Sequence, residues 1–185
     1  EINVNCHWHN EIFCAMEKIS HQGVNLMTCS GKGTSIFEPN STLSRILYNG
    51  NETAEGLFIR HQHFKYFPLN LSMLMENLTA IQLIGCGLKE LNARDLRNFT
   101  ELTSLWLPRN EIKILRNGTF DNNLKLRKMS FFGNQLKVIE SNILTALKNL
   151  IFVSFERNLC INMTAEEEED FDELKNEIAR NCEAP

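Results

Sequence analysis

Residues 102–115 read LTSLWLPRNEIKIL and follow the pattern LxxLxLxxNxL. The same pattern starts 24 residues earlier at Leu78 and 24 residues later at Leu126, begins again at Leu150, and has a weaker copy at Ala54. An even period of this length is the signature of a leucine-rich-repeat solenoid. The predicted fold class is therefore α/β: a leucine-rich-repeat solenoid with a parallel concave β-sheet, a disulfide-bearing N-terminal cap and a C-terminal capping helix.

The repeat places apolar residues at its positions 1, 4, 6 and 11. In the copy that starts at Leu102 these are Leu102, Leu105, Leu107 and Ile112. Alternation at positions 4 and 6 predicts a short strand with one face inward, and further apolar residues at positions 14, 19 and 22 are expected to line the return segment. Stacking of neighbouring coils then buries an interior that no single coil buries alone.

Position 9 is asparagine in three copies, as Asn110, Asn134 and Asn158, but it is Cys86 in the second copy. An inward Asn can pair with backbone groups of the neighbouring coil that would otherwise be buried without partners. Cys86 is interpreted as a small buried residue. The alternative, a catalytic nucleophile, needs a histidine brought alongside it.

Both ends of the chain carry cysteines. Residues 1–42 are predicted to form the N-terminal cap and contain Cys6, Cys14 and Cys29, among which Cys6–Cys14 is the favoured pair although sequence does not fix the connectivity. Residues 43–159 hold the repeats, with an irregular first strand around Ile46.

Residues 160–185 are predicted to form a C-terminal cap helix. Thr164 and Glu167 make a capping-box pattern, and Phe171, Leu174 and Ile178 recur at helical spacing. The helix is expected to cover the last coil and to be stapled by a Cys160–Cys182 disulfide. The acidic run at residues 166–170 suits a helix start; the alternative is a patch for a basic partner.

Composition points to a folded extracellular domain. The apolar fraction is 43% and the net charge is −4, of which residues 166–170 supply more than the whole, so a nucleic-acid binder with its strongly basic face is not expected. No apolar run approaches ~18 residues, so no membrane span is expected. The chain starts at Glu1 and is interpreted as a mature product.

Seven N-x-S/T sequons support secretion and predict a glycoprotein. They are Asn40, Asn51, Asn70, Asn77, Asn98, Asn117 and Asn162. The alternative is that an Asn-rich chain produces sequons by chance.

Neither a metal site nor a cofactor is expected. The pairs His7/His9 and His61/His63 have the two-residue spacing of ligands on one strand face, but no carboxylate or cysteine completes either set. No Ser–His–Asp set, carboxylate pair or phosphate loop is recognisable, so the chain is not expected to be an enzyme.

The strand residues at positions 3, 5, 7 and 8 are expected to form the concave face. The candidate partner-binding residues are Phe58, Arg60, Gln82, Ile84, Trp106, Arg109, Lys128, Phe132, Phe152 and Arg157. Aromatic and Arg side chains are the types enriched in interface hot spots. The alternative is that the rings pack on each other or are covered by a cap or the N-terminal loop.

The repeat with cysteine-bearing ends is similar to extracellular leucine-rich-repeat proteins in general, and several short stretches resemble small secreted leucine-rich-repeat proteins of dipteran insects. These stretches are residues 66–71 (YFPLNL), 147–150 (LKNL) and 157–161 (RNLCI), together with Asn181-Cys182. The likeness runs from about residue 43 to the end. Such proteins resemble the mosquito leucine-rich immune proteins, which implies recognition of complement-like or pathogen partners in immunity. Unlike them, this chain has no coiled-coil segment.

The function expected from the sequence is therefore that of a secreted, non-catalytic recognition module. Its concave aromatic and basic face would bind a protein partner with acidic groups near an apolar anchor. The alternative is a structural or adhesive protein that self-associates, as a homodimer, through the same face or an open edge. Size in solution discriminates the two, because self-association depends on concentration.

Overall fold

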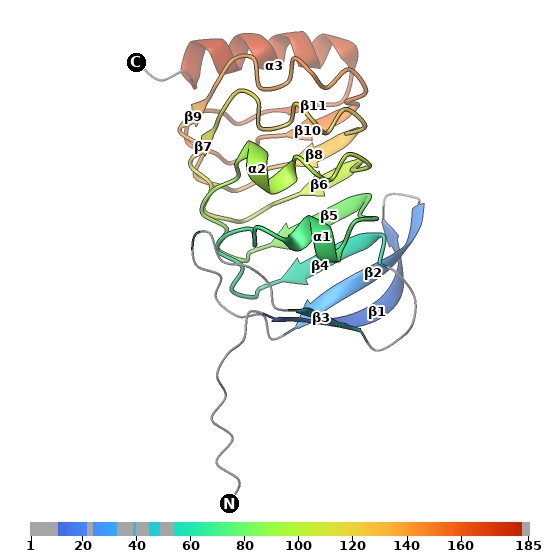
Figure 1. Cartoon of the computed structure of the whole chain (residues 1–185). Coiled ribbons are helices and arrows are strands. Elements are labelled where there is room, and N and C mark those ends of the chain that lie inside the picture. Colours follow the sequence, from blue (N-terminus) through green and yellow to red (C-terminus); the bar gives the residue numbers. More distant parts are fainter. Residues whose placement is uncertain (1–10, 22–23, 33–38, 40–44, 49–53, 183–185) are drawn as a thin grey trace, which may run out of the picture.

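The computed structural model describes residues 11–21, 24–32, 39, 45–48 and 54–182, with side chains described from residue 54 onward. Figure 1 shows a stack of strands with a helix lying over one end and a long β-hairpin at the other. Within the described residues the strands form one nine-stranded sheet and one two-stranded sheet.

The nine-stranded sheet has the order β11-β10-β8-β6-β5-β4-β2-β1-β3. Its strands are β1 (Glu11–His21), β2 (Val24–Lys32), β3 (Arg45–Tyr48), β4 (Gly56–Arg60), β5 (Ala80–Ile84), β6 (Ser104–Trp106), β8 (Lys128–Ser130), β10 (Phe152–Ser154) and β11 (Thr164–Ala165). The smaller sheet pairs β7 (Ile114–Leu115) with β9 (Val138–Ile139). The helices are α1 (Leu71–Leu74), α2 (Ala93–Leu96) and α3 (Glu168–Asn181).

The parallel-strand solenoid is confirmed. Strands β4, β5, β6, β8 and β10 are parallel neighbours, and the chain makes about four turns between the first and the last of them. Each residue pairs with the residue 24 positions later, as Leu105 does with Met129. The side chains at positions 4 and 6 of every coil are buried in one continuous apolar core. The sequence period and the spatial period are therefore the same.

The position-9 asparagines connect neighbouring coils. Asn110 Oδ1 accepts the N–H groups of Cys86 (3.0 Å) and Leu88 (3.1 Å), and its Nδ2 donates to the carbonyls of Leu83 (2.8 Å) and Leu107 (3.0 Å). Asn134 and Asn158 make the same two donor bonds one and two coils later, and the Oδ1 of each accepts one N–H of the preceding coil, from Ile112 and Leu136. These amides satisfy backbone groups in a core that offers no water, as predicted.

Cys86 occupies position 9 of the second coil, where its side chain replaces the donor of the asparagine amide but not the acceptor. Its Sγ lies 3.4 Å from the carbonyl oxygens of Ile59 and Ile84, so the thiol can donate as an amide N–H would. The acceptor part is taken by the Cys86 backbone carbonyl, which receives the N–H of Phe64 (3.0 Å). The side chain is buried and is the free cysteine among the described residues. The interpretation of Cys86 as a small buried residue is confirmed.

Asn123 is a second buried amide, at position 22, where the other coils carry Met75, Phe99 and Leu147. Its Nδ2 donates to the carbonyls of Leu96 (3.0 Å) and Phe99 (2.9 Å). Within the described residues no donor reaches its Oδ1. The two carbonyls also accept backbone N–H groups, so they do not depend on Asn123.

The two ends of the sheet are covered differently. At the N-terminal end β1 and β2 form an antiparallel hairpin, β3 pairs with β1, and β2 pairs in parallel with β4, so the hairpin continues the solenoid sheet. Cys6 and the side chains of Cys14 and Cys29 lie outside the described residues, as does the predicted Cys6–Cys14 pair. A paired β4 has no free strand edge to template association.

At the C-terminal end β11 turns back antiparallel to β10, and α3 packs over the last coil. Leu174 and Ile178 of α3 are buried against the core, and Phe171 packs beside them. The Cys160–Cys182 disulfide joins the ends of this segment, as predicted. The Cys182 carbonyl accepts the Ile139 N–H (2.9 Å), which ties the end of α3 to the solenoid.

The capping-box prediction is wrong in its residues. Thr164 lies in β11, where pairing with β10 already satisfies the backbone, so the helix starts only at Glu168. Its capping acceptor is Asp170, whose Oδ2 receives the N–H groups of Glu167 (3.0 Å) and Glu166 (3.1 Å). These two hydrogen bonds lower the pKa of the Asp170 carboxyl below its ordinary value, and the bond from Glu167 has the larger effect.

Substitutions of Asn110 and Asn123 are expected to lower the free energy of unfolding by unequal amounts. Asn110→Leu leaves the N–H groups of Cys86 and Leu88 buried without an acceptor, at about 1–3 kcal/mol each, so we expect a loss of roughly 3 kcal/mol in the free energy of unfolding. Asn123→Leu removes only an unsatisfied oxygen and two redundant donors, and should change stability by less than about 1 kcal/mol. Urea denaturation measures both. Equal losses of stability would show that Asn110 does not stabilise the fold by accepting the buried N–H groups of Cys86 and Leu88.

Asp170 is expected to make stability depend on pH. Because its folded pKa is lowered, its contribution is present above the ordinary Asp pKa of about 3.9 and disappears as pH falls through the lowered folded value. Wild type should therefore melt above Asp170→Asn at pH 7, and the difference in Tm should shrink in acid. Melting curves from pH 7 downward test this; a Tm difference that stays constant contradicts it.

Candidate functional site: the concave groove

The strand ends on the concave side share one unusual backbone conformation. Position 8 has a positive φ in every coil: His61 (50°), Gly85 (59°), Arg109 (57°), Gly133 (65°) and Arg157 (55°). This left-handed turn suits glycine and is uncommon for other residues. The N–H of each of these residues, up to Gly133, donates to the position-7 carbonyl of the next coil, as Arg109 does to Phe132 (2.7 Å). The sheet bonding thus continues past the strands.

The residues at position 8 alternate between a large side chain and glycine. A Cβ on Gly85 would lie 2.9 Å from His61 Nδ1, and one on Gly133 would lie 3.7 Å from Arg109 Cγ. The His61 and Arg109 side chains therefore lie over the glycine of the following coil. Glycine at residues 85 and 133 leaves the space that the His61 and Arg109 side chains occupy.

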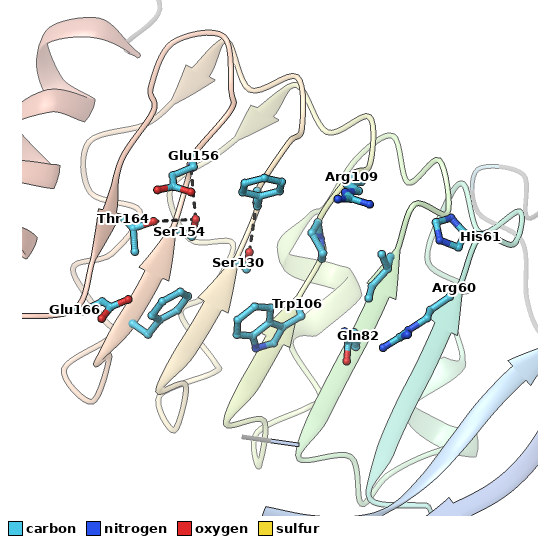
Figure 2. Close-up of a pocket in the computed structure, with 14 residues that line it drawn as sticks. Arg60, His61, Gln82, Trp106, Arg109, Ser130, Ser154, Glu156, Thr164 and Glu166 are labelled. Atoms are coloured by element: carbon cyan, nitrogen blue, oxygen red, sulfur yellow. Dashed lines mark hydrogen bonds between the residues drawn. The ribbon is translucent and has the colours of Figure 1, made fainter. Parts of the chain in front are cut away.

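An open groove of about 740 Å³ follows the concave face from β4 to β11 (Figure 2). Seven of the residues predicted to bind a partner line it: Arg60, Gln82, Ile84, Trp106, Arg109, Phe132 and Phe152. The structure thus brings together side chains spread over most of the repeat region. Phe58, Lys128 and Arg157 do not line the groove.

Phe58 and Arg157 lie next to groove residues and pair with them. The Arg60 guanidinium lies 4.3 Å from the centroid of the Phe58 ring, and that of Arg157 lies 5.1 Å from the centroid of the Phe132 ring. Such cation–π contacts hold a charged group in place and cover one ring face. Lys128 is half-buried on β8.

Aromatic packing also shapes the groove. The rings of Trp106 and Phe152 stack with centroids 5.6 Å apart and planes 14° apart, across the intervening strand β8. They can do so because the neighbouring concave residues Ser130 and Ser154 are small and buried. The alternative expectation, that rings pack on each other, is thus confirmed for this pair. Both rings remain half-buried and still line the groove.

Hydroxyl groups on the groove floor bond to each other and to the backbone. Thr164 Oγ1 bonds Ser154 Oγ (3.0 Å), and Ser154 Oγ accepts the N–H of Glu156 (3.5 Å) (Figure 2). Ser130 Oγ likewise accepts the N–H of Phe132 (3.4 Å). The bond from Thr164 ties β11, and with it Glu166, to the floor of the groove.

Several charged residues outside the groove form ion pairs. Lys125 pairs with Glu101 (2.6 Å), Lys175 with Asp172 (2.8 Å), and Arg180 with Glu177 (3.1 Å), all outside the groove. By contrast Arg60, Arg109, Glu156 and Glu166 line the groove and form no ion pair with any described residue.

These groove charges are also segregated. Figure 2 shows Arg60 and His61 at the β4 end and Glu156 and Glu166 at the β10–β11 end. The groove is therefore basic at its β4 end and acidic at its β10–β11 end, with Arg109 between the two ends. The sequence predicted an aromatic and basic face; the structure adds Glu166, which comes from β11 and lies outside the repeats.

Seven further residues line the groove: His61, Pro108, Ser130, Ser154, Glu156, Thr164 and Glu166. All but two of them stand at outward positions of the repeat, so the sequence period contains the signal for them. Thr164 and Glu166 carry no such signal, because only the backward turn of β11 brings them to the groove.

The remaining sequence candidates lie away from the groove. Asn77, Asn98, Asn117 and Asn162 are exposed and Asn70 is half-buried, while Asn40 and Asn51 lie outside the described residues. The Asn162 side-chain oxygen accepts the N–H of Arg157 (2.8 Å) in the β10–β11 turn. The buried thiol of Cys86 does not have the environment of a nucleophile. Burial raises the pKa of the Cys86 thiol, despite opposing backbone hydrogen bonds. A raised pKa disfavours the thiolate that a nucleophile needs.

The described residues hold neither a metal-binding cluster nor a helix that could span a membrane. They contain no cluster of three or more potential metal-binding side chains, and His61 and His63 have no such companions. No helix in the described part of the chain has the length and apolar character that crossing a bilayer requires.

Comparison with known proteins assigns no family. The sequence matches no protein-family model, and it matches none of the curated proteins. Function must therefore be argued from the chemistry of the groove.

The position-8 turns predict a difference between two glycine substitutions. Gly133→Ala should cost about 1 kcal/mol of stability from its left-handed backbone alone. Gly85→Ala should cost more, because its Cβ would also displace the His61 ring. In a His61→Ala background the two costs should become equal, which a double-mutant cycle measures by urea denaturation. Equal costs already in the wild-type background would show that His61 moves aside freely.

Proposed function

We propose that this chain is a secreted leucine-rich-repeat protein of the dipteran kind that binds a protein partner non-catalytically through its concave groove. The observation that carries the proposal is the groove itself. It combines half-buried aromatic side chains with four charged groups that no described residue neutralises. Arg and aromatic side chains are typical of interface hot spots.

The leucine-rich-repeat identity is supported by the 24-residue register of the strands and by the position-9 amides that bridge the coils. Secretion is supported by the Cys160–Cys182 disulfide, since such bonds persist in oxidising compartments. The exposed sequons, none of which lines the groove, are consistent with glycans that leave the groove open. A role in immunity rests on the resemblance to the mosquito proteins.

The experiment is a pull-down from the fluids of the secreting organism and its host. Wild type is compared with Trp106→Ala/Phe132→Ala, which we expect to lose the partner, because hot-spot truncations cost about 2 kcal/mol each, or roughly thirtyfold in affinity. The matched control is Met73→Ala/Leu159→Ala, which removes two large apolar side chains that are exposed outside the groove.

The three proteins must first show the same far-UV spectrum and a cooperative melting transition. A partner that both double variants retain as well as wild type does would move the binding surface away from the groove. A partner lost only with the control variant would place the binding surface around Met73 or Leu159.

Self-association remains a second candidate because the groove is basic at one end and acidic at the other. A two-fold axis through its centre would set Arg60 of one copy against Glu156 or Glu166 of the other. Sedimentation velocity over a hundredfold concentration range tests this candidate. It predicts a concentration-dependent dimer that Trp106→Ala/Phe132→Ala abolishes.

A further inference from the structure

One line of side chains crosses the whole groove. Position 7 of the five coils is Arg60, Ile84, Pro108, Phe132 and Glu156, and all five residues line the groove. The line thus begins with a cation, continues with three apolar residues and ends with an anion.

Backbone hydrogen bonds fix these five residues as successive neighbours. The N–H of the residue after each of the first four donates to the next position-7 carbonyl, at 2.8 Å (Ile84), 3.0 Å (Pro108), 2.7 Å (Phe132) and 2.9 Å (Glu156). Neighbouring strands are spaced by about 4.8 Å, so four steps separate Arg60 from Glu156 by roughly 19 Å. The charge separation follows from the sheet and does not depend on a flexible loop.

Each end of the line is reinforced. Arg60 is exposed, but its guanidinium is held over the Phe58 ring, so less conformational freedom is lost when it binds an anion. Glu166, placed by β11, adds a second carboxylate at the acidic end, while Arg109 lies between the two ends, over Gly133.

The groove is too long for a compact ligand. Its lining comes from six adjacent strands, β4 to β11, which span about 24 Å at the usual strand spacing. An extended peptide rises about 3.3 Å per residue, so a segment of roughly seven residues covers this length. Its opposite charges would have to be about six residues apart to reach Arg60 and Glu156.

We propose that the groove binds one extended segment of the partner protein that carries an acidic residue at the Arg60 end, apolar side chains over Ile84, Pro108 and Phe132, and a basic residue at the Glu156–Glu166 end. The proposal rests on the proposed function and specifies its ligand. Charge complementarity supports it, because each end of the groove holds charges of one sign that have no ion-pair partner among the described residues. Such complementarity sets the orientation and the choice of partner.

The test begins with random twelve-residue peptides displayed on phage. They are selected on the wild-type protein and counter-selected on Trp106→Ala/Phe132→Ala, so that only groove-dependent peptides survive. The expected survivors carry Asp or Glu about six residues from Lys or Arg, with apolar residues between them. Survivors with charges of one sign, or without charge, overturn the inference.

The second step uses a synthetic copy of the most enriched peptide in a fluorescence-anisotropy titration. Glu156→Lys should weaken its binding by about tenfold or more, because like charges are brought together. Replacing the basic residue of the peptide by Glu should restore binding to Glu156→Lys and weaken binding to wild type. The matched control is Glu173→Lys, an equal charge change on the exposed side of α3, which should leave the affinity unchanged.

The outcomes separate this inference from the proposed function. If Glu156→Lys has no effect while Trp106→Ala/Phe132→Ala still loses the natural partner, the dipolar ligand is wrong and the groove remains the binding site. If no groove-dependent peptide is enriched, the peptide ligand is rejected; if the natural partner is also retained by the double variant, the proposed function falls too. A dimer of this chain that the double variant abolishes would assign the groove to a second copy.

Discussion

The structure depends on the buried side-chain amide at position 9 of the coil. Each of these asparagines bonds both its own coil and the preceding one, and so satisfies polar backbone groups where the chain leaves its strand and no water can reach. Such a two-coil bond is correct at only one register, because a shift by one residue would turn the amide outward and leave the backbone groups unpaired. Cys86 shows that another residue can replace the asparagine: its thiol supplies a hydrogen-bond donor, and its backbone carbonyl replaces the missing side-chain acceptor.

A fixed register is also what gives the concave face its chemistry. Residues 24 apart in the chain become neighbours at one strand spacing, so any pattern in the repeats becomes a line of side chains in space. The line at position 7 separates a cation from an anion by the width of the sheet. At position 8 the left-handed turns alternate between large residues and glycine, which gives His61 and Arg109 space above the following coil. The same backbone constraint therefore stabilises the solenoid and orients the groove.

The C-terminal cap has a structural and a functional part. Strand β11, α3 and the Cys160–Cys182 disulfide close the last coil, which would otherwise expose an apolar face and a free strand edge. The same strand completes the groove, because Thr164 bonds its floor and Glu166 supplies one of its two carboxylates. A disulfide that closes a loop of this size stabilises a fold by about 3 kcal/mol in the chain-entropy account. Loss of the cap would thus remove stability and half of the acidic end together.

The sequence alone determined the period, the inward residues of each strand and the bridging asparagines, since all of these follow from a repeat whose spacing has no slip. It also predicted the Cys160–Cys182 pairing, from the apolar helical spacing between these two cysteines. It also identified most of the groove, because outward positions are set by the same period. Tertiary structure decided three things. The ring stack of Trp106 and Phe152 depends on how small the intervening serines are in three dimensions. Asp170 caps α3 in place of the predicted Thr164, because Thr164 lies in β11 and pairs with β10. Glu166 reaches the acidic end of the groove because the chain reverses after β10, and the repeat pattern does not predict this reversal.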